Sequence, residues 1–236
     1  MKTYKLEKDT TTICDRAFVN NEELRTICFN EKIEFIGNGA FINCENLQLD
    51  EIPKSVRYIG RHAFSGCNSL GQLTIKGQIT CIMHASFQDC KNLRLISFPK
   101  TVKKIEDFAF AQCEKLFTIS PFPDDCDLGQ GVFCDCKSLK SIILPSNLSV
   151  VRSFLFQNCK SLSSLLIPDK VHKIEQHAFQ GCENLKEIIL PGTLKKVEND
   201  VFDGCSNLKE IQIPKGSSEF FMELLGEKFQ NKLIEQ

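Results

Sequence analysis

Thirteen cysteines and four histidines are the residues of this chain whose side chains could do chemistry. Cys126, Cys134 and Cys136 lie in one short segment, and Asp124, Asp125 and Asp127 stand close to Cys126. A zinc ion needs about four such ligands in a tetrahedral arrangement, and C-D-C with scattered aspartates is a weak signal for one. Cys126 and Cys134 could instead form a disulfide. We favour two inert thiols, and we predict neither a metal site nor a cofactor.

The histidines give no sign of a catalytic group. His62, His84, His172 and His177 stand in no nucleophile motif with a serine or a cysteine. The chain also lacks G-x-S-x-G, a glycine-rich phosphate loop and H-E-x-x-H. We therefore expect solvated histidines on the surface, no catalytic residues and no enzymatic activity.

Eight cysteines, Cys136 among them, form a ladder in which every interval equals the one from Cys44 to Cys67. Copies of one position in neighbouring parallel strands lie about 4.8 Å apart. Parallel side chains stacked in this way do not easily reach the torsion of a disulfide. We therefore predict buried free thiols that behave as small apolar residues. The ladder consists of Cys44, Cys67, Cys90, Cys113, Cys136, Cys159, Cys182 and Cys205.

The ladder belongs to a repeat that runs through the whole chain. Each ladder cysteine follows a phenylalanine by three residues, and a leucine follows the same phenylalanine by six. The phenylalanines recur at the same interval as the cysteines, with no insertion or deletion between any two of them. Such spacing predicts a solenoid, in which each repeat covers the core of its neighbours. The nine anchors, which number the repeats from one to nine, are Phe18, Phe41, Phe64, Phe87, Phe110, Phe133, Phe156, Phe179 and Phe202.

Each repeat contains a short strand, an extended connector and a short helical turn. In repeat eight the strand is Leu185–Leu190, and Pro191 ends it because proline cannot donate a hydrogen bond to a ladder. Two apolar residues of the connector, such as Val171 and Ile174, precede the turn Ala178–Cys182. Ile174 and the apolar residues of that turn share one helical face. We predict that all these positions form the core.

The unit L-x-x-I-x-I-P-x-x-V-x-x-I-x-x-x-A-F-x-x-C resembles the BspA-type, or Treponema pallidum-type, leucine-rich repeat over roughly residues 4–214. The resemblance implies a leucine-rich repeat solenoid, right-handed and curved. A parallel sheet would line one face, with short helical turns on the convex side. Members of the family are often bacterial or protist surface proteins linked to adhesion and protein binding. The family has no catalytic residues to transfer.

Two repeats depart from the pattern. Asp50 occupies an inward strand position in L-Q-L-D-E-I-P, where we expect a local bulge because a buried lone carboxylate is costly. In I-S-P-F-P-D-D-C, Asp125 stands where other repeats have valine, isoleucine or leucine. At the repeat's constant interval, Cys126 and Cys134 correspond to positions that we expect to lie on the surface in other repeats. We predict that this repeat is the least regular one.

The two ends of the chain differ. Residues 1–216 are predicted to form the solenoid and 217–236 a C-terminal capping helix with Phe221, Leu224, Leu225 and Phe229 on one face. The first strand has no obvious cap, so self-association through this uncapped N-terminal repeat is a hypothesis.

Composition excludes some classes of function. A net charge of −1 gives no electrostatic footprint for nucleic acid, and no apolar run is long enough for membrane insertion. The first ten residues contain no apolar core of a signal peptide. The chain is expected to be cytoplasmic if Met1 is native. If a leader was removed, the family resemblance implies a secreted or cell-surface protein.

The open face of the sheet is the candidate binding surface. One strand position, outward-facing in the predicted sheet, changes from polar to apolar over repeats six to eight, and its neighbour carries lysines. A contiguous apolar patch often marks a contact surface, although β-branched residues also simply favour exposed strands. We predict a non-enzymatic protein–protein interaction module that binds a protein or peptide there. The alternative is a cell-surface adhesin for host matrix or glycan; two tyrosines and no tryptophan disfavour glycan. The predicted partner-binding residues are Ile143, Leu166, Ile189, Lys140, Lys186 and Lys209.

Overall fold

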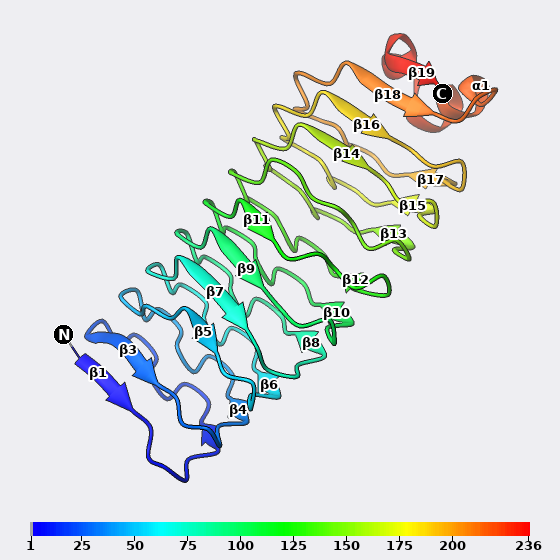
Figure 1. Ribbon diagram of the computed structural model, residues 1–236. Coiled ribbons are helices and arrows are strands. Elements are labelled where there is room, and N and C mark those ends of the chain that lie inside the picture. The colour runs from blue at the N-terminus through cyan, green and yellow to red at the C-terminus, as the bar shows by residue number, and fades with distance from the viewer. Residues whose placement is uncertain (1) are drawn as a thin grey trace.

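The computed structural model describes residues 2–236 and shows a parallel-sheet β-solenoid of about ten turns (Figure 1). The chain climbs one turn per repeat, so its two ends lie at opposite ends of an elongated body. Residues 23 positions apart lie on neighbouring turns, as where the Asn43 side-chain amide donates to that of Asn20. This architecture confirms the predicted leucine-rich repeat solenoid. No helix in residues 2–236 is long and apolar enough to cross a membrane.

Two series of parallel strands run along the solenoid. The strands of the main sheet face, which have two to five residues, are β1 (Lys2–Lys5), β3 (Leu24–Cys28), β5 (Glu51–Ile52), β7 (Gln72–Ile75), β9 (Leu95–Ser97), β11 (Thr118–Ile119), β14 (Ser164–Leu166), β16 (Glu187–Ile189) and β18 (Glu210–Ile213). The second series has two residues each: β2 (Thr12–Ile13), β4 (Phe35–Ile36), β6 (Tyr58–Ile59), β8 (Cys81–Ile82), β10 (Lys104–Ile105), β12 (Asp127–Leu128), β13 (Val150–Val151), β15 (Lys173–Ile174) and β17 (Lys196–Val197).

Strand register follows the repeat. Leu73 pairs with Ile96, and Ile188 pairs with Ile211, each one repeat further on. Successive side chains of a strand point to opposite faces. Ile188 is therefore buried while its neighbours Glu187 and Ile189 are half-exposed on the open face.

The anchors form a continuous stack through the core. Neighbouring rings are parallel, with centroids 5.1 Å apart for Phe41 and Phe64 and 5.7 Å apart for Phe179 and Phe202. Burying one such side chain stabilises the fold by about 1.5–3 kcal/mol. Each repeat therefore gains stability mainly from covering the core of the next one.

Short turns form the side opposite the main sheet. Along a turn, backbone N–H groups donate alternately to the next repeat and within the turn itself. Phe41 N–H donates to the Ala63 carbonyl of the next repeat, and Cys44 N–H donates to the Phe41 carbonyl of its own turn. Left-handed backbone recurs two residues before and two after each anchor, as at His177 and Gly181. The same backbone path is thus imposed on many residue types, because the stacked repeats determine it.

The cysteine ladder is buried and free of disulfides, as predicted. Each thiol also donates a hydrogen bond that the sequence did not reveal. Cys113 Sγ lies 3.2 Å from the Phe87 carbonyl oxygen, and Cys205 Sγ lies 3.1 Å from that of Phe179. Burial raises the pKa of the Cys90 thiol to about 12. The ladder is therefore a row of protonated thiols that tie each repeat to the one before.

Native thiol reactivity should follow this arrangement. At neutral pH, iodoacetamide should modify the exposed Cys14 and Cys28 at least a hundredfold faster than the ladder cysteines, since the thiolate is the nucleophile. Mass spectrometry of the labelled peptides measures the rates, and full reaction of all thirteen cysteines in denaturant is the control. Ladder labelling as fast as that of Cys28 would contradict the structure.

The C-terminal segment covers the last repeat. α1 (Ser218–Leu225) places Phe221 in the core, and Phe229 of the 3₁₀ helix η1 (Glu227–Lys232) packs edge-on against Phe202 at 5.6 Å. β19 (Leu233–Glu235) then pairs with β18. The helix thus takes only part of residues 217–236, and the last strand extends the sheet. The division into a solenoid and a cap at residue 216 stays a prediction, and Met1 lies outside the described residues.

Candidate interaction surface

The three predicted apolar residues lie on the open sheet face in neighbouring repeats. The side chain of Ile143 is 86% exposed and that of Leu166 60% exposed, whereas Ile189 is half-buried. Leu166 pairs directly with Ile189 across β14 and β16. Ile143 stands one repeat earlier, on a segment that is not a strand.

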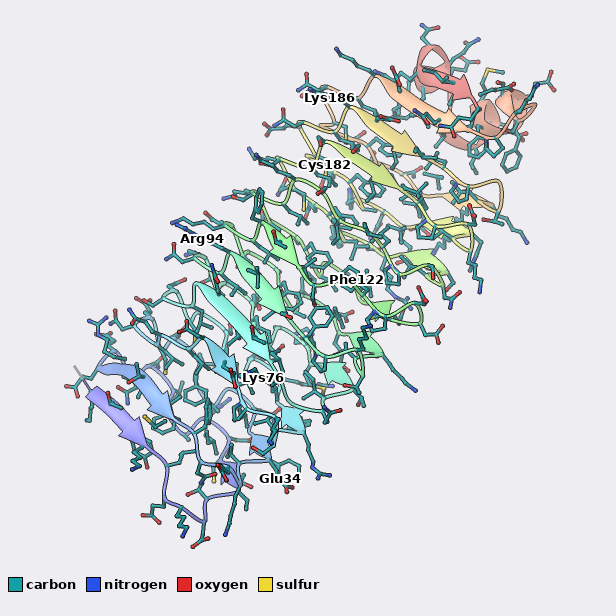
Figure 2. All side chains as sticks on the ribbon, viewed as in Figure 1. Glu34, Lys76, Arg94, Phe122, Cys182 and Lys186 are labelled. Atoms are coloured by element: carbon teal, nitrogen blue, oxygen red, sulfur yellow. The ribbon has the colours of Figure 1, made fainter. Side chains whose placement is uncertain are left out.

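The three predicted lysines lie along one edge of this face. Lys140, Lys186 and Lys209 are exposed, and the Lys209 N–H donates to the Lys186 carbonyl oxygen at 2.9 Å. Figure 2 shows Lys186 and Arg94 on the same long edge of the solenoid. The lysine edge therefore borders the exposed Ile143 and Leu166.

The main sheet is interrupted at repeat six. One sheet ends at β11 and the next begins at β14, and Figure 1 shows no main-face strand between them. Regular repeats are joined by bonds such as Ile167 N–H to the Ile189 carbonyl. The corresponding bond to the Ile143 carbonyl would need an N–H at Pro121, which proline lacks. The missing donor at Pro121 in repeat five thus explains why the main sheet is interrupted at repeat six.

Pro121 is an extra residue in its strand. After it, Phe122 takes the place that Phe98 holds one repeat earlier, with ring centroids 5.9 Å apart. The stretch from Cys126 to β12 is one residue shorter than the stretch from Val102 to β10. This deletion brings β12 back into register with β10. The irregularity predicted for this repeat is confirmed, and its cause is an insertion balanced by a deletion.

The same shift corrects the expectation for Cys126. Its side chain is buried, and its N–H donates to the Pro123 carbonyl as the N–H of Val102 donates to the Pro99 carbonyl. Asp125 is exposed instead. The surface position predicted for Cys126 was therefore wrong, because the repeat phase slips by one residue there.

The irregularity predicted at Asp50 is also confirmed. Asp50 is exposed at a bend, and Leu49 packs partly against the core. β3 and β5, on either side of this bend, belong to different sheets.

The Cys126–Cys136 segment holds free thiols. Cys134 is half-buried, with its Sγ 3.4 Å from the Gln157 Oε1 atom. Burial raises the pKa of both Cys126 and Cys134 to about 12. Within residues 2–236, no three histidine, cysteine or carboxylate side chains come together where they could hold a metal ion.

The histidines differ from the solvated residues that we expected. His172 is exposed, but the other three are half-buried against aromatic rings. His177 stacks on Phe154 at 5.2 Å, and His62 lies edge-on to His84 at 5.2 Å. Burial lowers the pKa of His62, with smaller contributions from His84 and Arg61. The surface expectation was therefore wrong for these three, since the turns stack them on their neighbours.

A cleft opens at the sheet break. It measures about 400 Å³, and two backbone bonds join the repeats on either side of it, from Ser138 N–H to the Glu114 carbonyl and from Asn147 N–H to the Asp124 carbonyl. Backbone groups of Ser141–Leu144 make no backbone hydrogen bond within the described chain. The cleft therefore combines apolar walls with unpaired backbone groups. Its apolar lining includes Phe117, Ile119, Phe122, Ile142 and Ile143.

Sequence reasoning missed Phe117. Its side chain is 52% exposed, and the Lys140 ammonium lies 5.5 Å from the ring centroid. The strand position that it occupies is mostly basic or polar in other repeats, as at Arg94, Lys186 and Lys209. An aromatic residue at such a position is the signal that could have identified it.

Comparison with known proteins agrees with this fold. A family model described as "BspA type Leucine rich repeat region (6 copies)" matches residues 1–117 and 122–225. The unmatched gap includes Pro121, the inserted residue. No curated protein matches the chain.

Several solved structures share the fold. The Treponema pallidum leucine-rich repeat protein is 27% identical with a TM-score of 0.62, over 76% of this chain and 84% of that one. A leucine-rich cell surface protein from Faecalibacterium prausnitzii A2-165 is 22% identical with a TM-score of 0.54, over 96% and 82%. The pneumococcal vaccine antigen PcpA is 17% identical with a TM-score of 0.59, over 100% and 68%.

Proposed function

Because the chain belongs to the BspA-type leucine-rich repeat family, we propose that it is a non-enzymatic interaction module that binds a protein or peptide on its open sheet face. The observation that carries this proposal is the exposure of Ile143 and Leu166 on the open face of neighbouring repeats. Isolated exposed apolar residues are ordinary on a protein surface, but a contiguous group marks a contact.

The rigidity of the face favours binding. Leu166 and Ile189 project from paired strands whose opposite sides are locked into the core by Leu165 and Ile188. Association therefore costs little ordering of the binding surface, and more of the contact energy appears as affinity. The lysine edge supplies a polar rim next to the apolar residues, as interfaces commonly have.

The test is affinity capture with a charge-bearing variant. The combined substitutions Ile143→Glu, Leu166→Glu and Ile189→Glu should abolish partner capture, because each places a charge where apolar contact is required. All three side chains point away from the core, so circular dichroism and the unfolding midpoint should stay close to wild type.

A matched control uses the same strand position in other repeats. Cys28→Glu, Thr74→Glu and Ser97→Glu add the same three charges away from the proposed patch. This control variant should retain the partner. A folded Ile143/Leu166/Ile189 variant that captures as well as wild type would contradict the proposal. Captures from lysate and from envelope fractions, run separately, would distinguish an internal partner from the adhesin alternative.

A further inference from the structure

The cleft at the sheet break is large enough to admit a large apolar side chain. Its volume of about 400 Å³ lies within the range of ligand pockets in proteins, about 300–1,000 Å³. Phe117 stands at one rim and Ile143 at the other, and both are more than half exposed. An apolar or aromatic side chain that entered between them would bury surface that now faces solvent.

The backbone beside the cleft suits an extended peptide. The N–H and C=O groups of Ser141–Leu144 have no backbone partner among residues 2–236, and Pro121 removes the donor that would serve the Ile143 carbonyl. Extended peptides are commonly recognised through unpaired strand groups of this kind, with pockets for their side chains.

The charged side chains around the cleft indicate which charge such a peptide would carry. Arg94, Lys115 and Lys140 are exposed around Phe117, and within residues 2–236 none of them forms a salt bridge. Other lysines near this edge are neutralised: Lys137 pairs with Glu114 at 2.9 Å and Lys160 with Glu183 at 2.7 Å. The edge near Phe117 therefore carries uncompensated positive charge, whereas Asp124, the carboxylate that lines the cleft itself, accepts a hydrogen bond from the Ser146 hydroxyl.

We infer that the open face takes an extended acidic peptide segment, with one apolar side chain in the cleft between Phe117 and Ile143 and carboxylates against Arg94, Lys115 and Lys140. This inference rests on the proposed function and adds the chemistry of the partner. Complementary charge steers association and fixes the register of the peptide. The apolar side chain supplies the buried anchor.

The experiment is fluorescence anisotropy with synthetic peptides. The peptide carries one phenylalanine between two runs of three glutamates and a fluorescein label. The wild-type chain should bind it at least tenfold more tightly than the same peptide with serine in place of phenylalanine. A basic peptide with lysines in place of the glutamates should show no binding. Affinity should fall as NaCl rises from about 50 to 500 mM, because salt screens exposed charges.

Variants of the chain locate the site. Lys140→Glu and Phe117→Ser should each weaken binding of the acidic peptide at least tenfold, with circular dichroism unchanged because both side chains are exposed. Lys195→Glu is the matched control, since it reverses an exposed lysine on a connector away from the cleft. It should leave the affinity unchanged.

Two outcomes would overturn the inference. One is equal affinity for the phenylalanine and serine peptides, and the other is unchanged affinity in folded Lys140→Glu and Phe117→Ser variants. The acidic peptide should also compete with any partner captured on the open face. If partner capture needs Ile143, Leu166 and Ile189 but the peptide neither binds nor competes, this inference fails while the proposed function stands.

Discussion

Above about pH 9 the free energy of unfolding should fall by roughly 1.4 kcal/mol per pH unit for each ladder thiol. Burial raises the pKa of Cys44 to about 11 and those of Cys90 and Cys205 to about 12. The folded chain therefore keeps thiol protons that the unfolded chain releases. Stability from the ladder is fully present below the ordinary thiol pKa of 9.0 and is lost as pH rises toward 11 to 12.

The size of this effect comes from repetition. The ladder has eight thiols, and burial raises the pKa of every one. Together the eight thiols lower the free energy of unfolding by roughly 11 kcal/mol per pH unit, which is comparable with the whole stability of a typical domain. Urea unfolding followed by circular dichroism from pH 7 to 11 should show a steep alkaline loss.

A double variant separates thiol ionisation from other alkaline effects. Cys90→Ala with Cys113→Ala lowers stability at pH 7 but should make the pH slope shallower by roughly 2.7 kcal/mol per unit, the share of two protons. Cys28→Ser removes an exposed thiol and should leave the slope unchanged. Lysine and tyrosine ionisation is common to all variants. Equal slopes in wild type and the double variant would refute the linkage.

The ladder shows what the spacing predicts and what it leaves out. Cysteines at one constant interval, each three positions after a phenylalanine, are enough to predict burial and the lack of disulfides. The bond from Cys113 Sγ to the Phe87 carbonyl is different, since a backbone carbonyl carries no sequence signal. That bond explains why a weak donor, and not alanine, occupies the position.

The irregular repeat was foreseen, but its register was not. The interval from Phe110 to Phe133 equals every other anchor interval because the insertion of Pro121 is balanced before β12. Constant anchor spacing therefore hid a shift that buries Cys126. The dipeptide Phe122-Pro123, which repeats Phe98-Pro99 one residue out of phase, is the visible trace of it.

The candidate site was also predictable only in part from the sequence. Alternation along a strand places Ile143, Leu166 and Ile189 outward, and the structure agrees for all three, with Ile189 the least exposed. The cleft depends on ladder bonds that are missing between repeats five and six. Pro121 signals one of them in the sequence, but the other unpaired backbone groups of Ser141–Leu144 carry no such signal. Phe117 was overlooked for that reason, since its position matters only beside the open cleft.

Phe110→Ala should destabilise the protein by about 3–5 kcal/mol, the usual cost of removing a buried phenylalanine. Its ring is fully buried between those of Phe87 and Phe133, at 5.6 and 6.1 Å. The matched control is Phe117→Ala seven residues later, where the half-exposed ring leaves no cavity and the loss should be under about 1 kcal/mol. Urea unfolding at pH 7 measures both variants.

The position of Phe110 adds a second expectation, about cooperativity. Repeats five and six share no main-face strand pairing, so the stacked core, the short β10–β12 pairing and the turn bonds, such as Phe110 N–H to the Val132 carbonyl, couple the two halves. In a solenoid, stability is approximately a sum over repeats and their interfaces. Weakening this interface should split unfolding into two transitions, with hydrogen exchange becoming faster on one side of repeat five than on the other. Phe64→Ala removes the same ring from repeat three, whose main-face strand β7 is paired on both sides, and should keep a single transition. A single transition in both variants would mean that the sheet break does not weaken the coupling between repeats five and six.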